Sequence, residues 1–178
     1  GKGVYRLNFD TKKNLIESNN KVSKYTTDDG LPLGSLYKIV LFEYKGEILF
    51  GTENGTYRFD RNSKSFNIDE RFSKLPNYKN NKVIRVDKDP SGDYWFVLQN
   101  RSKGFRDVSF YTISDKLQFT KLELGKLKHY SRIKLNFYKE KVLLSGTRGI
   151  AIFPIKYMVK EPQGRVIINQ ISVKNKSI

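Results

Sequence analysis

Few side chains in this chain of 178 residues could take part in catalysis. It contains no cysteine and a single histidine, His129, which excludes thiolate nucleophiles, zinc–thiolate sites and centres built from several histidines. A Ser-His-Asp triad would depend on His129 alone. Composition does not exclude a pair of catalytic carboxylates, which need only be close in space, but no spacing marks one. We therefore expect no catalytic residue, no metal ligand and no cofactor in this chain.

One acidic stretch begins like a calcium-binding loop. Residues 87–93 place oxygen-bearing side chains at loop positions 1, 3 and 5 and a glycine at position 6. Such a loop also requires a bidentate glutamate at position 12, where this chain has Leu98 within an expected strand. Residues 89–92, Asp-Pro-Ser-Gly, instead suit a type I turn. We interpret them as a turn, and Asp-Asp-Gly at 28–30 as a connection between strands.

The net charge of +16 could suggest a nucleic-acid-binding protein. The basic residues are scattered, however, with no more than two in a row, as at Lys12 and Lys13. No recognition helix, aromatic RNA-binding motif or zinc-finger spacing is present, so we expect no nucleic-acid partner. The preferred interpretation of the charge is a solvated lysine-rich surface. The alternatives are an anionic ligand, such as an acidic or sulfated glycan, and membrane headgroups.

The loop at residues 99–106 is the strongest candidate for ligand contact. It is long and cationic and lies at the end of an expected strand, where binding residues tend to be placed. The alternative is an exposed loop with no ligand. Trp95 could stack on a sugar ring, but packing in the core is the preferred interpretation. The predicted ligand-binding residues are Arg101, Lys103 and Arg106.

The elements that would position these residues are strands, arranged in a repeat. One phrase occupies residues 46–60 and returns in weaker or shorter form at 92–97, at 141–153 and at 3–7. A period of about 45–50 residues made of short strands is typical of a β-propeller with one four-stranded sheet per repeat. Within the first copy, residues 48–50 are continuously apolar, which predicts a strand buried on both faces.

Turn signals separate the expected strands. Lys45 and Gly46 favour one turn, and residues 114–116 another. Asn54 followed by Gly55 predicts a hairpin turn with positive φ at both central residues.

The predicted fold is therefore all-β: about 3.5 four-stranded blades of a seven-bladed β-propeller. Residues 1–155 form the partial propeller, and 156–178 form a linker and the first strand of a β-sandwich. Because propellers close with roughly 4–8 blades, we expect a piece of a longer protein. In isolation it would be poorly stable, aggregate, or associate with another copy through exposed blade faces. The blades are expected near residues 36–69, 82–124 and 131–155, with an incomplete blade at 1–20.

The blade phrase resembles the two-component regulator propeller repeat. Asp-Gly-Leu-Pro at 29–32 matches the connection of that repeat, and residues 46–60 match nearly all of the rest. Leu49 stands where the family prefers tryptophan, and Trp95 occupies that position in the next copy. Residues 146–150 fit again.

Part of the resemblance departs from the family pattern or extends past the propeller. In the second copy Val97 and Leu98 replace the expected Gly-Thr, and Gly104 comes late, which predicts an enlarged loop. Residues 164–173 look like the opening strand of the three-tyrosine domain, the β-sandwich that follows such propellers.

The resemblance implies the periplasmic sensor region of a membrane-anchored, homodimeric hybrid histidine kinase. Such a protein would detect an oligosaccharide, anionic if the charge serves recognition, and regulate polysaccharide-utilisation genes. This part of it would not be an enzyme. The alternative is a secreted carbohydrate-active enzyme or a lectin-like binding propeller.

Overall fold

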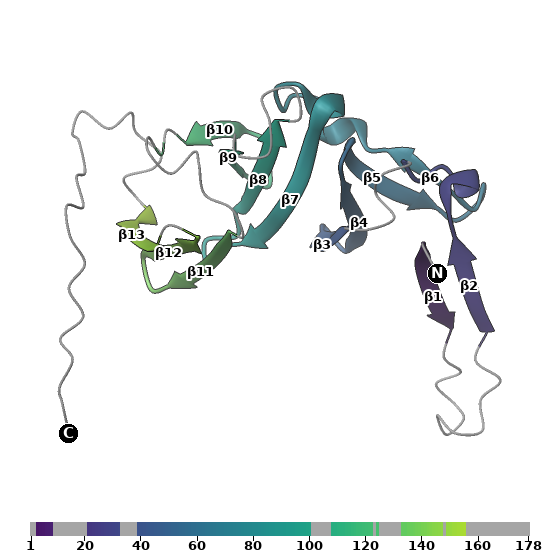
Figure 1. Cartoon of the computed structure of the whole chain (residues 1–178), viewed down its shortest axis with the longest axis horizontal. Helices are drawn as coiled ribbons and strands as arrows, with labels where there is room; N and C mark the ends of the chain where they lie inside the picture. Colours follow the sequence, from purple (N-terminus) through teal and green to yellow (C-terminus); the bar gives the residue numbers. More distant parts are fainter. Residues whose placement is uncertain are drawn as a thin grey trace, which may run out of the picture.

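A computed structural model describes residues 3–8, 21–32, 39–100, 108–122, 124, 133–147 and 149–155. Across these ranges the fold is all-β, as predicted: thirteen strands form four antiparallel sheets (Figure 1). The helices described are single turns of 3₁₀ type, η1 (Thr27–Asp29), η3 (Glu70–Phe72) and η4 (Tyr78–Asn80). None of the described helices is long and apolar enough to cross a membrane.

Each sheet is built from strands that follow one another along the chain. The first sheet pairs β1 (Val4–Asn8) with β2 (Lys21–Tyr25). The second contains β3 (Val40–Tyr44), β4 (Glu47–Thr52), β5 (Gly55–Asp60) and β6 (Ser65–Ile68). The third contains β7 (Asn81–Lys88), β8 (Tyr94–Asn100), β9 (Val108–Ile113) and β10 (Phe119–Leu122). The fourth contains β11 (Lys134–Tyr138), β12 (Lys141–Gly146) and β13 (Gly149–Pro154).

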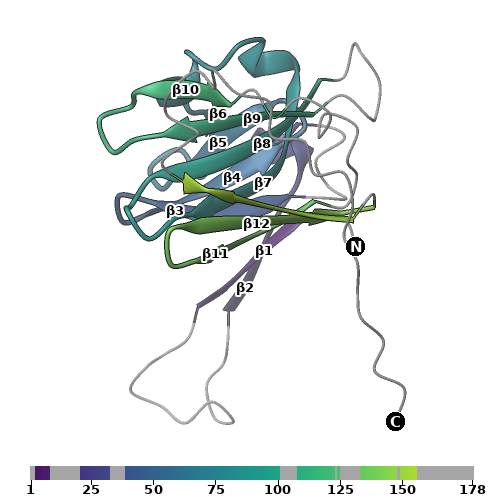
Figure 2. The ribbon, with the colours of Figure 1, turned by 90° about the vertical axis from the view of Figure 1, so that its left-hand side faces the viewer.

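The sheets are stacked face to face in chain order along an open arc, and within the described ranges they form no closed ring (Figures 1 and 2). An apolar cluster fills each of the three junctions between neighbouring sheets. The predicted tail at 156–178 lies outside the described residues, as do 9–20 of the predicted incomplete blade, whose described pairing continues to Tyr25.

Strand β8 shows how one strand serves two junctions. Tyr94, Phe96 and Leu98 point toward the second sheet, whereas Trp95 and Val97 point toward the fourth. All five side chains are buried. Successive side chains of a strand alternate between its faces, so a strand covered on both sides requires an unbroken apolar run.

The same prediction for residues 48–50 is only partly correct. Leu49 and Phe50 are buried on opposite faces of β4, but Ile48 is 56% exposed. Ile48 lies on the side of the first sheet, whose two strands do not cover it.

The predicted turn at Asn54–Gly55 is wrong in its geometry. Thr52 pairs with Gly55, so Glu53 and Asn54 occupy the turn, and of Asn54 and Gly55 only the glycine has positive φ, at 101°. The Thr52 hydroxyl accepts from the Asn54 N–H at 3.1 Å and donates to the Gly55 carbonyl at 2.8 Å. These local bonds favour a loop with one glycine in the left-handed region. The turn with two positive φ angles lies at Lys45 and Gly46, where a turn was predicted.

Candidate functional site

The predicted ligand loop joins β8 to β9. Its three cations, Arg101, Lys103 and Arg106, and the sole histidine, His129, lie outside the described residues. The pairing of Gln99 with Val108 holds the two ends of the loop side by side on neighbouring strands. Ligand binding by these cations therefore stays a prediction.

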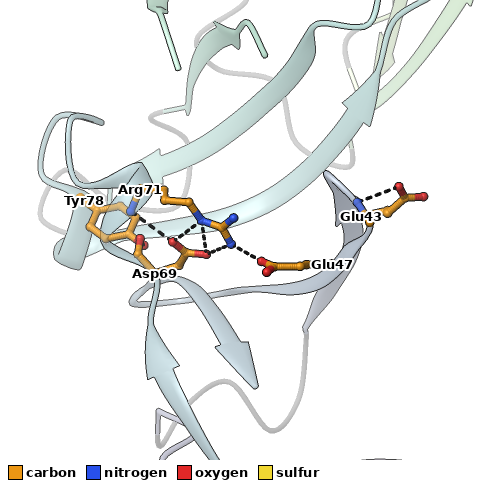
Figure 3. Close-up of polar contacts among 6 residues, drawn as sticks. Glu43, Glu47, Asp69, Arg71 and Tyr78 are labelled. Atoms are coloured by element: carbon orange, nitrogen blue, oxygen red, sulfur yellow. Dashed lines mark hydrogen bonds and ion pairs between the residues drawn. The ribbon is translucent and has the colours of Figure 1, made fainter. Parts of the chain in front are cut away.

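The densest polar site described is formed by Asp69, Arg71 and Glu47 (Figure 3). Asp69 caps the short helix η3, where its carboxylate accepts the Arg71 backbone N–H at 3.1 Å. The Arg71 guanidinium then folds back onto the same carboxylate through Nε at 2.9 Å and Nη2 at 2.6 Å. Nη2 also donates to Glu47 at the start of β4, at 2.5 Å. The site joins segments 24 residues apart in the sequence.

These contacts fix the charge state of Arg71 and limit its chemistry. The hydrogen bond to Asp69 is the main cause of a raised pKa for the guanidinium, which stays protonated. Its Cζ also lies 5.4 Å from the centre of the Tyr44 ring, a cation–π contact. An arginine fork can bind a phosphate or carboxylate ligand, but here two protein carboxylates occupy it. The trio carries a net negative charge, so its arrangement suits clamping η3 to β4 rather than binding an anion.

Tyr78 lies beside Asp69 at the same edge of the second sheet. Its buried hydroxyl lies 2.8 Å from the Thr56 carbonyl and 2.6 Å from the Asp69 carbonyl, to which it donates. Burial is the main cause of a strongly raised pKa for the Tyr78 phenol. The phenol therefore stays protonated near neutral pH, and its hydrogen bonds tie η4 to the second sheet.

The acidic turn that begins like a calcium loop is a structural turn, as predicted. The Asp89 carboxylate accepts from the Ser91 N–H at 2.9 Å, the Ser91 hydroxyl at 2.6 Å, the Asp93 N–H at 3.1 Å and the Trp95 indole N–H at 2.9 Å. Asp87 instead pairs with Arg85. Among the residues that the structure describes, no group of three His, Cys, Asp or Glu side chains could hold a metal ion.

Trp95 is confirmed as a core residue. It is 1% exposed and packs against the Phe137 ring at 5.5 Å, between the third and fourth sheets. A sugar ring could not reach this indole in the folded chain.

Asp93, next to this turn, has a carboxyl with a raised pKa. Burial first, then the charges of Asp89 and Asp115, raise the pKa of its carboxyl above 3.8. A raised carboxyl pKa means that the ionised form is disfavoured in the folded state. Stability is therefore lost as pH rises from the ordinary pKa through the folded one.

We expect Asp93→Asn to raise stability at pH 7 and to have no effect well below pH 4, where Asp93 is protonated in both states. Urea unfolding across this pH range measures the difference. Asp60→Asn is the matched control, because the Asn62 backbone N–H lowers the pKa of that exposed carboxyl, so its substitution should not stabilise. Equal responses of the two variants would contradict the prediction.

The Asp69 and Tyr78 sites were not among the residues predicted from the sequence, although the sequence contains signals for both. Residues 70–81 lie between two of the expected blades. Phe72, Leu75 and Tyr78 recur there at a spacing of three residues, typical of 3₁₀ turns with one face on the core, and all three are buried. An aspartate directly before a short helical turn is also a usual cap.

No family model matches this chain. No curated protein shows a significant match to it either.

Proposed function

We propose that this chain is part of a β-propeller in the periplasmic sensor region of a two-component hybrid histidine kinase, where it takes part in detecting an oligosaccharide. The observation that carries the proposal is the agreement between sequence repeat and sheet repeat. The phrase at residues 46–60 covers β4 and β5 of the second sheet. Residues 92–97 enter β8 of the third sheet, and 141–153 cover β12 and most of β13 of the fourth.

The proposed role is binding without catalysis. The polar side chains of Asp69, Arg71 and Asp89 form hydrogen bonds that hold turns and short helices in place. Ligand contacts would come from loops at the strand ends, where residues can vary without disturbing the stacked sheets. Binding would favour one placement of the propeller relative to the domain that follows, and so pass a population shift toward the kinase.

The surrounding gene sequence tests this proposal directly. A β-sandwich, a membrane span and a kinase domain encoded after residue 178 would support the sensor. A signal peptide before the propeller and a stop codon soon after it would instead favour a secreted lectin-like protein or carbohydrate-active enzyme.

The loop cations carry a separate prediction about the ligand. In the complete sensor region, the triple substitution of Arg101, Lys103 and Arg106 by alanine should weaken binding of a uronate or sulfated oligosaccharide about tenfold at low salt. The reason is that each exposed ion pair contributes less than about 1 kcal/mol and is screened by salt, so the effect should shrink near 0.15 M. Titration calorimetry measures both.

The matched control removes three cations from described turns of the sheets, Arg61, Lys116 and Lys139. This control has the same change in net charge, so any loss it shares with the loop variant is a general charge effect. Binding of a neutral oligosaccharide without salt dependence, or equal losses in the two variants, would refute a role for the loop.

A further inference from the structure

The two ends of the stack expose the kind of surface that its three junctions bury. Each sheet has a trailing face, toward the preceding sheet along the chain, and a leading face, toward the following sheet. Inside the stack, every junction joins a leading face to a trailing face through apolar side chains. The first sheet has no sheet against its trailing face, and the fourth has none against its leading face, within the described part of the chain (Figure 1).

The fourth sheet shows this most clearly through an internal comparison. Tyr44 and Tyr138 both end the first strand of their sheet, and each is followed by a lysine whose Nζ lies 5.6 or 5.4 Å from the ring centre. Tyr44 lies in the junction with the third sheet and is 0% exposed, whereas Tyr138 is 63% exposed. Strand pairing places Ile150 and Ile152 on the same leading face, and both are about half exposed.

The first sheet presents the complementary surface. In the repeat, Tyr5 and Leu7 occupy the positions of Tyr57 and Phe59, which pack into the junction on the trailing side of the second sheet. Tyr5 and Leu7 are each 51% exposed, and Val22, which pairs with Leu7, is 55% exposed.

We propose that these two faces bind each other between copies of this chain: the leading face of the fourth sheet, around Tyr138, Ile150 and Ile152, packs on the trailing face of the first sheet of a second copy, around Tyr5, Leu7 and Val22. The contact repeats, between chains, the junction that the chain already forms three times within itself. It rests on the stacked sheets alone and is independent of the ligand and of the kinase.

The contact is head-to-tail, so a dimer that uses it twice closes into a ring. Two copies stacked in this way would supply eight sheets, four of them with fewer than four described strands, at the upper end of the roughly 4–8 sheets of closed propellers. The open arc in Figure 1, with β1–β2 at one end and β11–β13 at the other, has the form such a closure needs.

The net charge of the chain determines whether salt strengthens or weakens the association of two copies. Each copy carries +16, so two copies repel each other, while the proposed contact is apolar. Salt screens the repulsion and leaves the apolar contact in place. Association should therefore tighten with ionic strength, the opposite of an interface held by ion pairs.

Light scattering and sedimentation of the 178-residue chain test the proposal. We expect a mass twice the 20.8 kDa of one chain, with a smaller dissociation constant at about 0.5 M than at about 0.05 M salt. Ile152→Glu on the leading face and Leu7→Glu on the trailing face should each weaken association at least about tenfold, because a carboxylate would be buried unpaired. Ser63→Glu, at the exposed turn between β5 and β6, adds the same charge and should change little.

A mixture of the two face variants separates head-to-tail from symmetric pairing. Ile152→Glu keeps an intact trailing face and Leu7→Glu an intact leading face, so the mixture should form a heterodimer with one contact, although neither variant dimerises well alone. A monomer at all concentrations would overturn the proposal. Normal dimers of either face variant would overturn the head-to-tail arrangement. A mass that grows without limit would overturn the closed ring.

Discussion

Replacing Gly30 by alanine should destabilise the junction between the first and second sheets by about 2–4 kcal/mol. Gly30 ends η1 with φ at 90°, and an added Cβ would lie 2.3 Å from the Phe66 carbonyl oxygen of β6. The backbone on both sides would have to separate. Leu31, which follows directly and is 3% exposed, would be displaced from the cluster that it shares with Phe66. Urea unfolding measures the loss of stability, and hydrogen exchange in β1 and β2 locates it.

Gly46→Ala is the matched control for this prediction. Gly46 also has positive φ, at 79°, but no atom lies within 4 Å of the position of an added Cβ. That substitution therefore adds only the conformational strain of alanine, about 1 kcal/mol, without a collision. If the two variants lose equal stability, the close approach of Gly30 to Phe66 is not the reason why a glycine is needed at position 30.

The fold could be predicted in outline because the stacked sheets leave a direct trace in the sequence. A strand covered on both faces needs consecutive apolar residues, and residues 94–98 supply them. The Asp-Pro-Ser-Gly turn could be predicted because its geometry depends on residues within it. The Gly92 N–H indeed donates to the Asp89 carbonyl at 3.0 Å.

Features that depend on distant or competing partners could not be predicted from local sequence. Nothing around Ile48 indicates that the sheet on its side has two strands within the described residues. The Asn54–Gly55 prediction failed because the hydroxyl of Thr52, outside the pair considered, binds the Asn54 N–H. Likewise, Arg71 is one basic residue among 34 until the fold brings Glu47 beside it.

The sequence predicts the candidate site only as a cationic loop, without saying which of its side chains would contact a ligand. Charge and loop length favour the loop at residues 99–106, but recognition depends on which cations converge in space, and spacing in one sequence does not fix that. By contrast, the repeat allows internal comparison: Tyr44 and Tyr138 are equivalent positions in different surroundings. Their exposures, 0% and 63%, identify the open face without any second protein.

Asp89→Ala should be the most damaging substitution at a polar side chain described here, with an expected loss of about 3 kcal/mol in the free energy of unfolding. Asp89 is 6% exposed, and its side chain accepts four hydrogen bonds. Without it the indole N–H of Trp95 would be left unpaired in an apolar cluster, and two backbone N–H groups of the turn would lose their acceptor. Asp89→Asn keeps one acceptor oxygen and should lie between alanine and the native residue.

Asp60→Ala provides the control, because the Asp60 carboxylate caps a turn in the same way, accepting the Asn62 N–H at 2.8 Å, but in an exposed position. Water can replace that acceptor, so the loss of stability should be much smaller than for Asp89→Ala. Trp95 is the single tryptophan of the chain, so its fluorescence reports on this site directly. Asp89→Ala should change the emission of the folded protein, and Asp60→Ala should not. Equal losses of stability with an unchanged Trp95 spectrum would show that the bond from Asp89 to the indole does not hold the third and fourth sheets together.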